Sequence, residues 1–189
     1  MSALLEQARH RLTTADYHKM GAAGIFRPTD RVELIEGEII DMAPIGSAHA
    51  GIVALLNNRL VPAMAGQAII NVQNPVVLGE HSEPQPDLSI LKPRPDFYRN
   101  SHPTPADIML LIEVAETSID FDREIKLPLY ARHDVPEVWL VDLRQKVLTM
   151  HRTPIEDMYR ETLQPSDLTR VVSLKLPQAA LDLSDLFWF

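Results

Sequence analysis

The sequence predicts an α/β (α+β) fold in which one mixed β-sheet is flanked by helices. The chain has 189 residues, 46% of them hydrophobic and 23% charged, which is ordinary for one globular domain. Short segments rich in Ile, Val and Leu, typical of strands, are interspersed with segments of helical periodicity. No repeat, low-complexity tract or flexible linker divides the chain. We therefore expect one domain over residues 1–189, with residues 1–13 as a loose N-terminal extension.

The first expected element is a short helix over residues 14–22. Thr13 or Thr14 can cap it, because a hydroxyl oxygen accepts a hydrogen bond from a free backbone N–H of the first turn. Asp16 lies in that first turn, where the positive end of the helix dipole favours a carboxylate. These signals predict where the helix begins.

A hairpin and a long helix follow. The segment VELIEGEIIDMAP, residues 32–44, alternates around Gly37 and predicts two short strands joined at Glu36 and Gly37. In residues 46–66, apolar side chains recur at helical spacing behind Ser47, which can cap the segment. We expect this segment to be the first long helix.

Three apolar segments are expected to form the centre of the sheet. They cover residues 68–79, 86–91 and 108–114, and are rich in the β-branched and large apolar residues that favour strands. Residues 92–107 contain four prolines in sixteen positions, which excludes regular structure. This segment is expected to be a long surface loop beside the strands.

The C-terminal half is expected to contain one more helix and further strands. Residues 120–134 have acids at the start and basic residues at the end, as the helix dipole favours. Pro128 removes a hydrogen bond and costs about 3 kcal/mol in a helix interior, so we expect a kink there or a helix that begins near Leu127. The strands that follow are expected at residues 137–142, 146–152, 157–163 and 170–176.

The composition restricts the chemistry and the cellular location. Cysteine is absent, which excludes disulfides and thiolate metal sites and favours a hard cation held by oxygen or histidine ligands. The net charge of −8 argues weakly against a broad basic surface for nucleic acid. No apolar run approaches the roughly 20 residues that span a bilayer, so we expect a cytoplasmic protein without membrane association.

Two carboxylates occupy strand segments where a charge is costly. Asp87 precedes LSIL, and Glu113 lies within LLIEVA. Burying an isolated carboxylate costs several kcal/mol, whereas a divalent cation between two carboxylates removes their repulsion. Mg²⁺ prefers such ligands and can activate water for attack on a phosphodiester, while a nearby lysine stabilises the developing charge. Two residues after Glu113 stands Ala115, so the nearest downstream lysine is Lys126.

Four blocks of the chain carry a resemblance to a known family. They read, in order, VELIEGEIIDMAPIGSAH, EPQPDLSIL, LLIEVAETSIDFDREIKLPLYARHDVPEVWLVD and LDLSDLF. The chain resembles the Uma-two family of restriction endonucleases, a branch of the PD-(D/E)xK nuclease superfamily, from about Thr14 to the C-terminus. The resemblance implies a restriction-endonuclease-like fold and a Mg²⁺-dependent phosphodiesterase site, with Mn²⁺ as a substitute ion.

The resemblance also implies which residues form the site. Asp87 in QPD and Glu113 in IEV are implied as metal ligands, and Glu36 in LIEGE as an additional acid. Lys126 is implied as the catalytic lysine, moved from the strand to the following helix. Alternative interpretations stay open: Glu113 as a solvent-facing or Arg-paired acid, Glu36 as an ordinary turn residue, and Lys126 as a solvated helix residue.

Three further residues are expected to assist the site. His49 lies in a block that contains a histidine in the family, which implies a catalytic or supporting role; the alternative is a capping or packing residue. Gln85 belongs to the QPD motif. Tyr130 lies four positions after Lys126 on the same helix face and can orient a site group; its alternative is packing at the surface.

The sequence thus leaves three hypotheses for the function. The first is a Mg²⁺-dependent endonuclease that hydrolyses DNA and acts as a homodimer, since two-fold symmetry suits the cutting of both strands. The second is a catalytically inactive binding module with the same fold, suggested by Ala115, Pro128 and the negative charge. The third is a metal-dependent hydrolase of a small phosphate ester, with the proline-rich loop covering a pocket.

Overall fold

The computed structural model describes residues 8–188, and its centre is a six-stranded mixed sheet. The strands are β3 Ile69–Val72, β4 Leu88–Leu91, β5 Ile108–Ala115, β6 Glu137–Asp142, β7 Val147–Ile155 and β8 Met158–Leu163. They lie in the order of their numbers, and neighbours are antiparallel except for the parallel pair β5 and β6. A parallel pair needs a long crossover connection, and the helical segment between β5 and β6 provides it.

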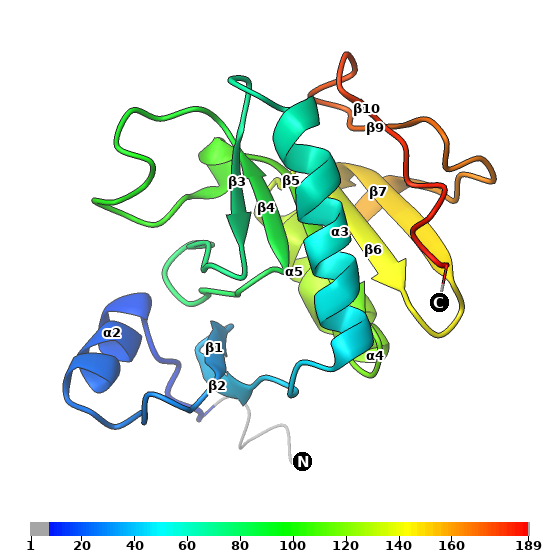
Figure 1. Ribbon diagram of the computed structural model, residues 1–189. Coiled ribbons are helices and arrows are strands. Elements are labelled where there is room, and N and C mark those ends of the chain that lie inside the picture. Colours follow the sequence, from blue (N-terminus) through cyan, green and yellow to red (C-terminus); the bar gives the residue numbers. More distant parts are fainter. Residues whose placement is uncertain (1–7, 189) are drawn as a thin grey trace.

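Helices cover both faces of this sheet (Figure 1). On one face lies α3 Ser47–Ala63; on the other lies the crossover, made of α4 Ile119–Phe121, the π-helical turn η2 Asp122–Lys126 and α5 Leu127–Arg132. Side chains of β5 alternate between the two faces. Leu110 and Ile112 therefore pack with α3, whereas Leu111 and Ala115 pack with α5. The sequence prediction of a mixed sheet between helices is confirmed.

The N-terminal part forms a separate layer beside the main sheet. It contains α2 Thr14–Ala22 and the hairpin of β1 Val32–Ile35 and β2 Glu38–Asp41 (Figure 1). The hairpin turn has positive φ at Glu36 (51°) and Gly37 (85°), as a two-residue turn between twisted strands requires. A Cβ at Gly37 would lie 2.6 Å from that of Arg11, so glycine also permits this close approach.

Several elements are found where the sequence predicts them. Helix α2 spans residues 14–22 and is capped by Thr13, whose side chain accepts from the Asp16 N–H. Helix α5 begins at Leu127 with Pro128 in its first turn, where a missing N–H is tolerated. Among the described helices, none is long and apolar enough to cross a membrane.

Two expected strands are much shorter than predicted. Within residues 68–79 the strand ends at Val72, shortly before Pro75, which has no backbone N–H to donate to a neighbouring strand. Within residues 170–176 only β9 Val171–Val172 is regular, and it pairs with β10 Ala180–Leu181 outside the main sheet. The reason is Glu137, a fully buried residue whose Oε2 accepts hydrogen bonds from the residues that follow β9.

The expected loose N-terminal extension is described in part. Residues 1–7 lie outside the described residues. Arg11 and Leu12 contact the hairpin turn, since the Arg11 Nε donates to the Glu36 carbonyl (2.8 Å) and the Leu12 N–H donates to the Gly37 carbonyl (3.0 Å). The chain just before α2 is thus held against the hairpin.

Candidate functional site

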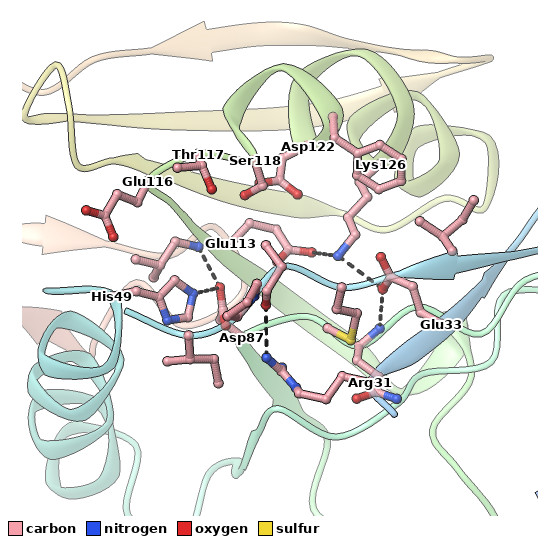
Figure 2. A pocket seen from close by; sticks show the side chains of 18 of the residues that line it. Arg31, Glu33, His49, Asp87, Glu113, Glu116, Thr117, Ser118, Asp122 and Lys126 are labelled. Atoms are coloured by element: carbon pink, nitrogen blue, oxygen red, sulfur yellow. Dashed lines mark hydrogen bonds and ion pairs between the residues drawn. The ribbon is translucent and has the colours of Figure 1, made fainter. Parts of the chain in front are cut away.

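A cavity of about 340 Å³ opens between the hairpin, the start of α3, the end of β5 and the crossover helix. Its lining contains an arginine, a histidine and a lysine, labelled in Figure 2 as Arg31, His49 and Lys126. Carboxylates outnumber them. The acids that line the cavity are Glu33, Asp41, Asp87, Glu113, Glu116 and Asp122. This excess of negative charge favours a bound cation.

Strand β5 directs Glu113 into the cavity. Alternation along the strand places Glu113 on the α5 face together with Leu111 and Ala115. Glu113 is only 4% exposed, and its Oε1 accepts hydrogen bonds from the Tyr130 hydroxyl (2.5 Å) and the Lys126 ammonium (3.4 Å). Burial raises the pKa of Glu113 to about 8, although the Lys126 charge opposes this rise. The interpretation as a solvent-facing strand acid does not fit this environment.

Lys126 reaches the cavity because the crossover helix contains a π-helical turn. The N–H of Leu127 donates to the carbonyl of Asp122, five residues earlier, where an α-helix would use the residue four earlier. This π-helical turn ends at Lys126, and Pro128 follows in the first turn of α5. Lys126 is 5% exposed, so it is a buried residue and does not point to solvent. The helix thus directs its ammonium toward the strand residue Glu113.

The Lys126 ammonium lies between two carboxylates (Figure 2). Its Nζ is 3.4 Å from Glu113 Oε1 and 3.2 Å from Glu33 Oε2. Burial alone would lower the pKa of Lys126, but these two neighbouring carboxylates raise it above its ordinary value. The side chain therefore stays protonated. Ala115, the position two residues after Glu113, is fully buried against α5 and leaves this space to Lys126.

Asp87 is held in a defined orientation by three neighbours. Its Oδ1 accepts from the Gln73 amide (3.1 Å), and its Oδ2 accepts from the Val114 N–H of β5 (2.9 Å). His49 Nε2 on α3 lies 3.0 Å from the same Oδ2. This hydrogen bond raises the pKa of His49, although burial opposes the rise. His49 thus contacts a site acid and makes no helix-capping hydrogen bond.

The structure does not bring Glu36 into the cavity. Glu36 is exposed at the hairpin turn, and its Oε1 pairs with the Arg132 guanidinium at 2.6 Å. The acids that this hairpin contributes to the cavity are Glu33 and Asp41, of which Glu33 is 3% exposed and contacts Lys126. Sequence analysis missed Glu33. Its position within the apolar segment VELI is the same signal that identified Glu113 in LLIEVA.

The two other assisting residues lie beside these acids. Gln85 lines the cavity, and its N–H donates to Glu33 Oε2 (3.0 Å) while its side-chain amide donates to the Val32 carbonyl (3.3 Å). Tyr130 is fully buried and donates to Glu113, so it is not a surface packing residue.

Sequence analysis did not include Asp122 and Arg31, which also line the cavity, among the candidates. Asp122 was interpreted as a helix-start acid, yet it is buried, and its Oδ2 accepts from the Ser118 hydroxyl (2.7 Å). Burial raises the pKa of Asp122. Arg31 borders the cavity and donates to the Ala43 carbonyl (3.2 Å), which orients its guanidinium. No sequence motif distinguished Arg31 from other surface arginines.

The oxygen-rich lining suits a hard divalent cation. Among residues 8–188, Glu113 makes its hydrogen bonds through Oε1, which leaves Oε2 available as a ligand. Asp87 accepts three hydrogen bonds, which leaves lone-pair capacity on its carboxylate. Carboxylate ligands completed by water are the arrangement that Mg²⁺ prefers. The donor set of Asp87 and Glu113 is therefore chemically suited to a hard divalent cation.

Comparisons with known proteins concern the family and the fold of this chain. A family model, Uma2, described as "Putative restriction endonuclease", matches residues 14–184. The chain is similar to a solved structure described as a "putative nuclease belonging to DUF820" from Anabaena variabilis, with 18% identity and a TM-score of 0.70. That similarity covers 94% of this chain and 98% of the other. A search of curated proteins finds no match.

Proposed function

Because this chain belongs to the Uma2 family of restriction endonucleases, we propose that it is a Mg²⁺-dependent endonuclease that hydrolyses DNA phosphodiester bonds. One observation carries the proposal: the buried Lys126 ammonium lies 3.4 Å from Glu113, in a cavity that also contains Asp87. A lysine is buried only when its charge has a use or a partner. A Lys126 in contact with a site acid supports an enzyme, whereas a solvated Lys126 would support an inactive binding module.

Each proposed site residue has a distinct role. Asp87 and Glu113 hold the ion, and Glu33 takes the place of Glu36 as the third acid, holding Lys126 at 3.2 Å. Lys126 orients the attacking water and stabilises negative charge on the phosphate. A bound Mg²⁺ supplies a water of lowered pKa and neutralises phosphate charge.

The remaining residues position these groups. His49 and the Val114 N–H hold Asp87, while Tyr130 fixes Glu113 through its hydroxyl. Gln85 holds Glu33 through its backbone N–H. We further propose that residues 1–189 act as one domain, and that two copies act together when both DNA strands are cut.

A plasmid-nicking assay tests the proposal. Purified protein is incubated with supercoiled plasmid and Mg²⁺, and conversion to open-circular and linear forms is measured. We expect nicking in Mg²⁺ or Mn²⁺, none in EDTA, and at least a roughly 10²-fold lower rate for Asp87→Ala and Glu113→Ala, because each removes a ligand. Absence of nicking, or nicking that survives both substitutions, contradicts the proposal.

A matched pair of variants tests which hairpin acid belongs to the site. Glu33→Gln removes a charge that contacts Lys126, whereas Glu36→Gln removes one that contacts Arg132 at the surface. We expect a roughly 10-fold or greater loss of nicking rate for the first variant and an unchanged rate for the second. Equal rates would refute the role of Glu33.

A second substrate separates a nuclease from a small-ester hydrolase. Activity on plasmid is compared with activity on a chromogenic phosphodiester dye at the same Mg²⁺ concentration. We expect faster cleavage of the plasmid, since Arg31 at the cavity border provides an additional phosphate contact. Faster cleavage of the dye would favour the small-ester hydrolase.

A further inference from the structure

A second group of metal-type ligands lies outside the cavity. His18 is on α2, Glu83 lies before the QPD motif, and His102 belongs to the proline-rich loop 92–107. One ligand atom from each residue lies within 4.8 Å of the other two. None of the three lines the cavity described above, so the group is separate from the proposed Mg²⁺ site.

Glu83 is the buried member of this group. The residue is 3% exposed, and its carboxylate oxygens lie 3.0 and 2.8 Å from a single atom, His18 Nε2. Among the described residues, no other side chain is assigned a hydrogen bond to this carboxylate. The His18 side chain is 52% exposed, so water competes for the contact. Burial removes water from the Glu83 carboxylate, and its one side-chain partner, which is half exposed, offsets little of that cost. The carboxylate is directed toward the two histidines.

The ligand types favour a transition metal over Mg²⁺. Two imidazole nitrogens and a carboxylate oxygen match the ligand set that holds Zn²⁺ with a water in the fourth position. Tetrahedral ligands about 2.0–2.1 Å from zinc lie about 3.3 Å from one another. The present ligand atoms lie within 4.8 Å of one another, and both histidines are exposed enough to rotate toward a common ion. Mg²⁺, in contrast, prefers oxygen ligands.

We propose that His18, Glu83 and His102 form a binding site for a divalent transition-metal ion, with Zn²⁺ as the best match. The ion would join α2 and loop 92–107 to the segment that leads to Asp87. The backbone of Glu83 is itself anchored, because its N–H donates to the Leu34 carbonyl of the hairpin (2.7 Å). Zn²⁺ would therefore stabilise the N-terminal layer against the main sheet. This site does not depend on the proposed nuclease function.

Calorimetric titration of ZnCl2 into untagged, EDTA-stripped protein tests the site. Wild-type protein is compared with His18→Gln and His102→Gln, two exposed positions where the substitution leaves the core intact. His151→Gln on β7 is the matched control, since this histidine is outside the cluster. We expect one Zn²⁺ per chain, affinity reduced roughly 10- to 100-fold in each cluster variant, and no change in the control.

Two further measurements make the result decisive. Zinc should raise the Tm of wild-type protein and of Asp87→Ala, but not that of His18→Gln. Co²⁺ should give the visible absorption of a four-coordinate site in wild-type protein and lose it in His102→Gln. Absence of saturable binding at micromolar Zn²⁺, or equal affinity in cluster and control variants, would overturn the proposal. Loss of binding in Asp87→Ala would instead assign the zinc to the cavity and also overturn it.

Discussion

Two ion pairs connect the hairpin to the crossover helix. Both join a glutamate to a basic side chain, but they differ in distance and in exposure to water. Glu36 and Arg132 lie 2.6 Å apart with side chains 50% and 39% exposed. Glu33 and Lys126 lie 3.2 Å apart with side chains 3% and 6% exposed. The shorter contact is the weaker one, because water screens it and an exposed pair contributes about 0–1 kcal/mol. The distance within an ion pair therefore does not by itself show which acid contributes more to stability.

Burial makes the second pair costly to break by removal of one partner. A charged group without a partner in the interior costs several kcal/mol, and Lys126 compensates two such groups, Glu33 and Glu113. The same burial keeps the site pre-organised, since the ammonium has little freedom to move. The comparison predicts that equivalent substitutions in the two pairs will have very different effects.

The largest effect is expected for Lys126→Met. This variant removes the buried cation beside Glu33 and Glu113, so we expect a loss of about 3–5 kcal/mol in the free energy of unfolding in EDTA. Nicking should be abolished. Urea denaturation followed by circular dichroism measures the stability, and the plasmid assay measures the activity.

Arg132→Met is the matched control, because it removes the cation of the exposed pair. We expect a change in unfolding free energy below about 1 kcal/mol and unchanged nicking. If the two variants were equally stable, the buried pair would contribute no more to the free energy of unfolding than the exposed pair, which would contradict the prediction.

A change in pH is expected to have an effect of intermediate size on stability, because it changes the protonation of Glu113. Burial raises its pKa to about 8 in the folded chain against an ordinary value of 4.5, so the folded state binds this proton more tightly than the unfolded state. Stability from this group is full below about pH 4.5 and is lost as pH rises toward 8. We expect metal-free protein to lose roughly 3 kcal/mol relative to Glu113→Gln between pH 5 and pH 8.

Glu113→Gln isolates this contribution, because glutamine does not titrate and can still accept from Tyr130. Unfolding free energies of both proteins are measured in EDTA at several pH values, and their difference is plotted. A difference that is independent of pH, or that grows in favour of the wild type as pH rises, would contradict the assignment. Adding Mg²⁺ at pH 8 should restore the stability of the wild type alone.

The smallest effect is expected for the surface pair in salt. A double-mutant cycle of Glu36→Gln and Arg132→Met should give a coupling energy below about 1 kcal/mol at low ionic strength. The coupling should vanish near 1 M NaCl, where the screening length is about 3 Å. A coupling that is large and independent of salt would show that Glu36 is held more tightly than its exposure indicates.

Part of the site follows from the sequence because its signals are local. Asp87 and Glu113 stand in short apolar segments where a charge needs a partner, and the four family blocks indicate the same residues. The structure brings both into one cavity with Lys126, His49 and Gln85. The helix that begins at Leu127 was also predicted, since proline limits where an α-helix can begin.

The third acid was assigned wrongly although a local signal was present. Glu33 and Glu36 stand three positions apart in VELIEGE, but Glu33 lies between Val32 and Leu34, whereas Glu36 precedes Gly37. In the structure the hairpin pairs with the segment around Glu83, and Glu33 is the acid that is buried. The family block drew attention to Glu36, although its place beside Gly37 is ordinary turn chemistry.

The sequence by itself determined the order of helices and strands and, through four blocks that resemble a known family, the fold family and the candidates Asp87, Glu113 and Lys126. The order of the elements depends on hydrophobic periodicity, and the choice of the two acids also on the cost of an unpaired charge in an apolar segment; both act over a few residues. Tertiary structure decided the rest: the burial of Glu33, the direction of Lys126 from its π-helical turn, and the approach of His18 to Glu83, 65 positions away. Contacts between distant segments depend on how whole layers pack, and a local pattern does not encode them.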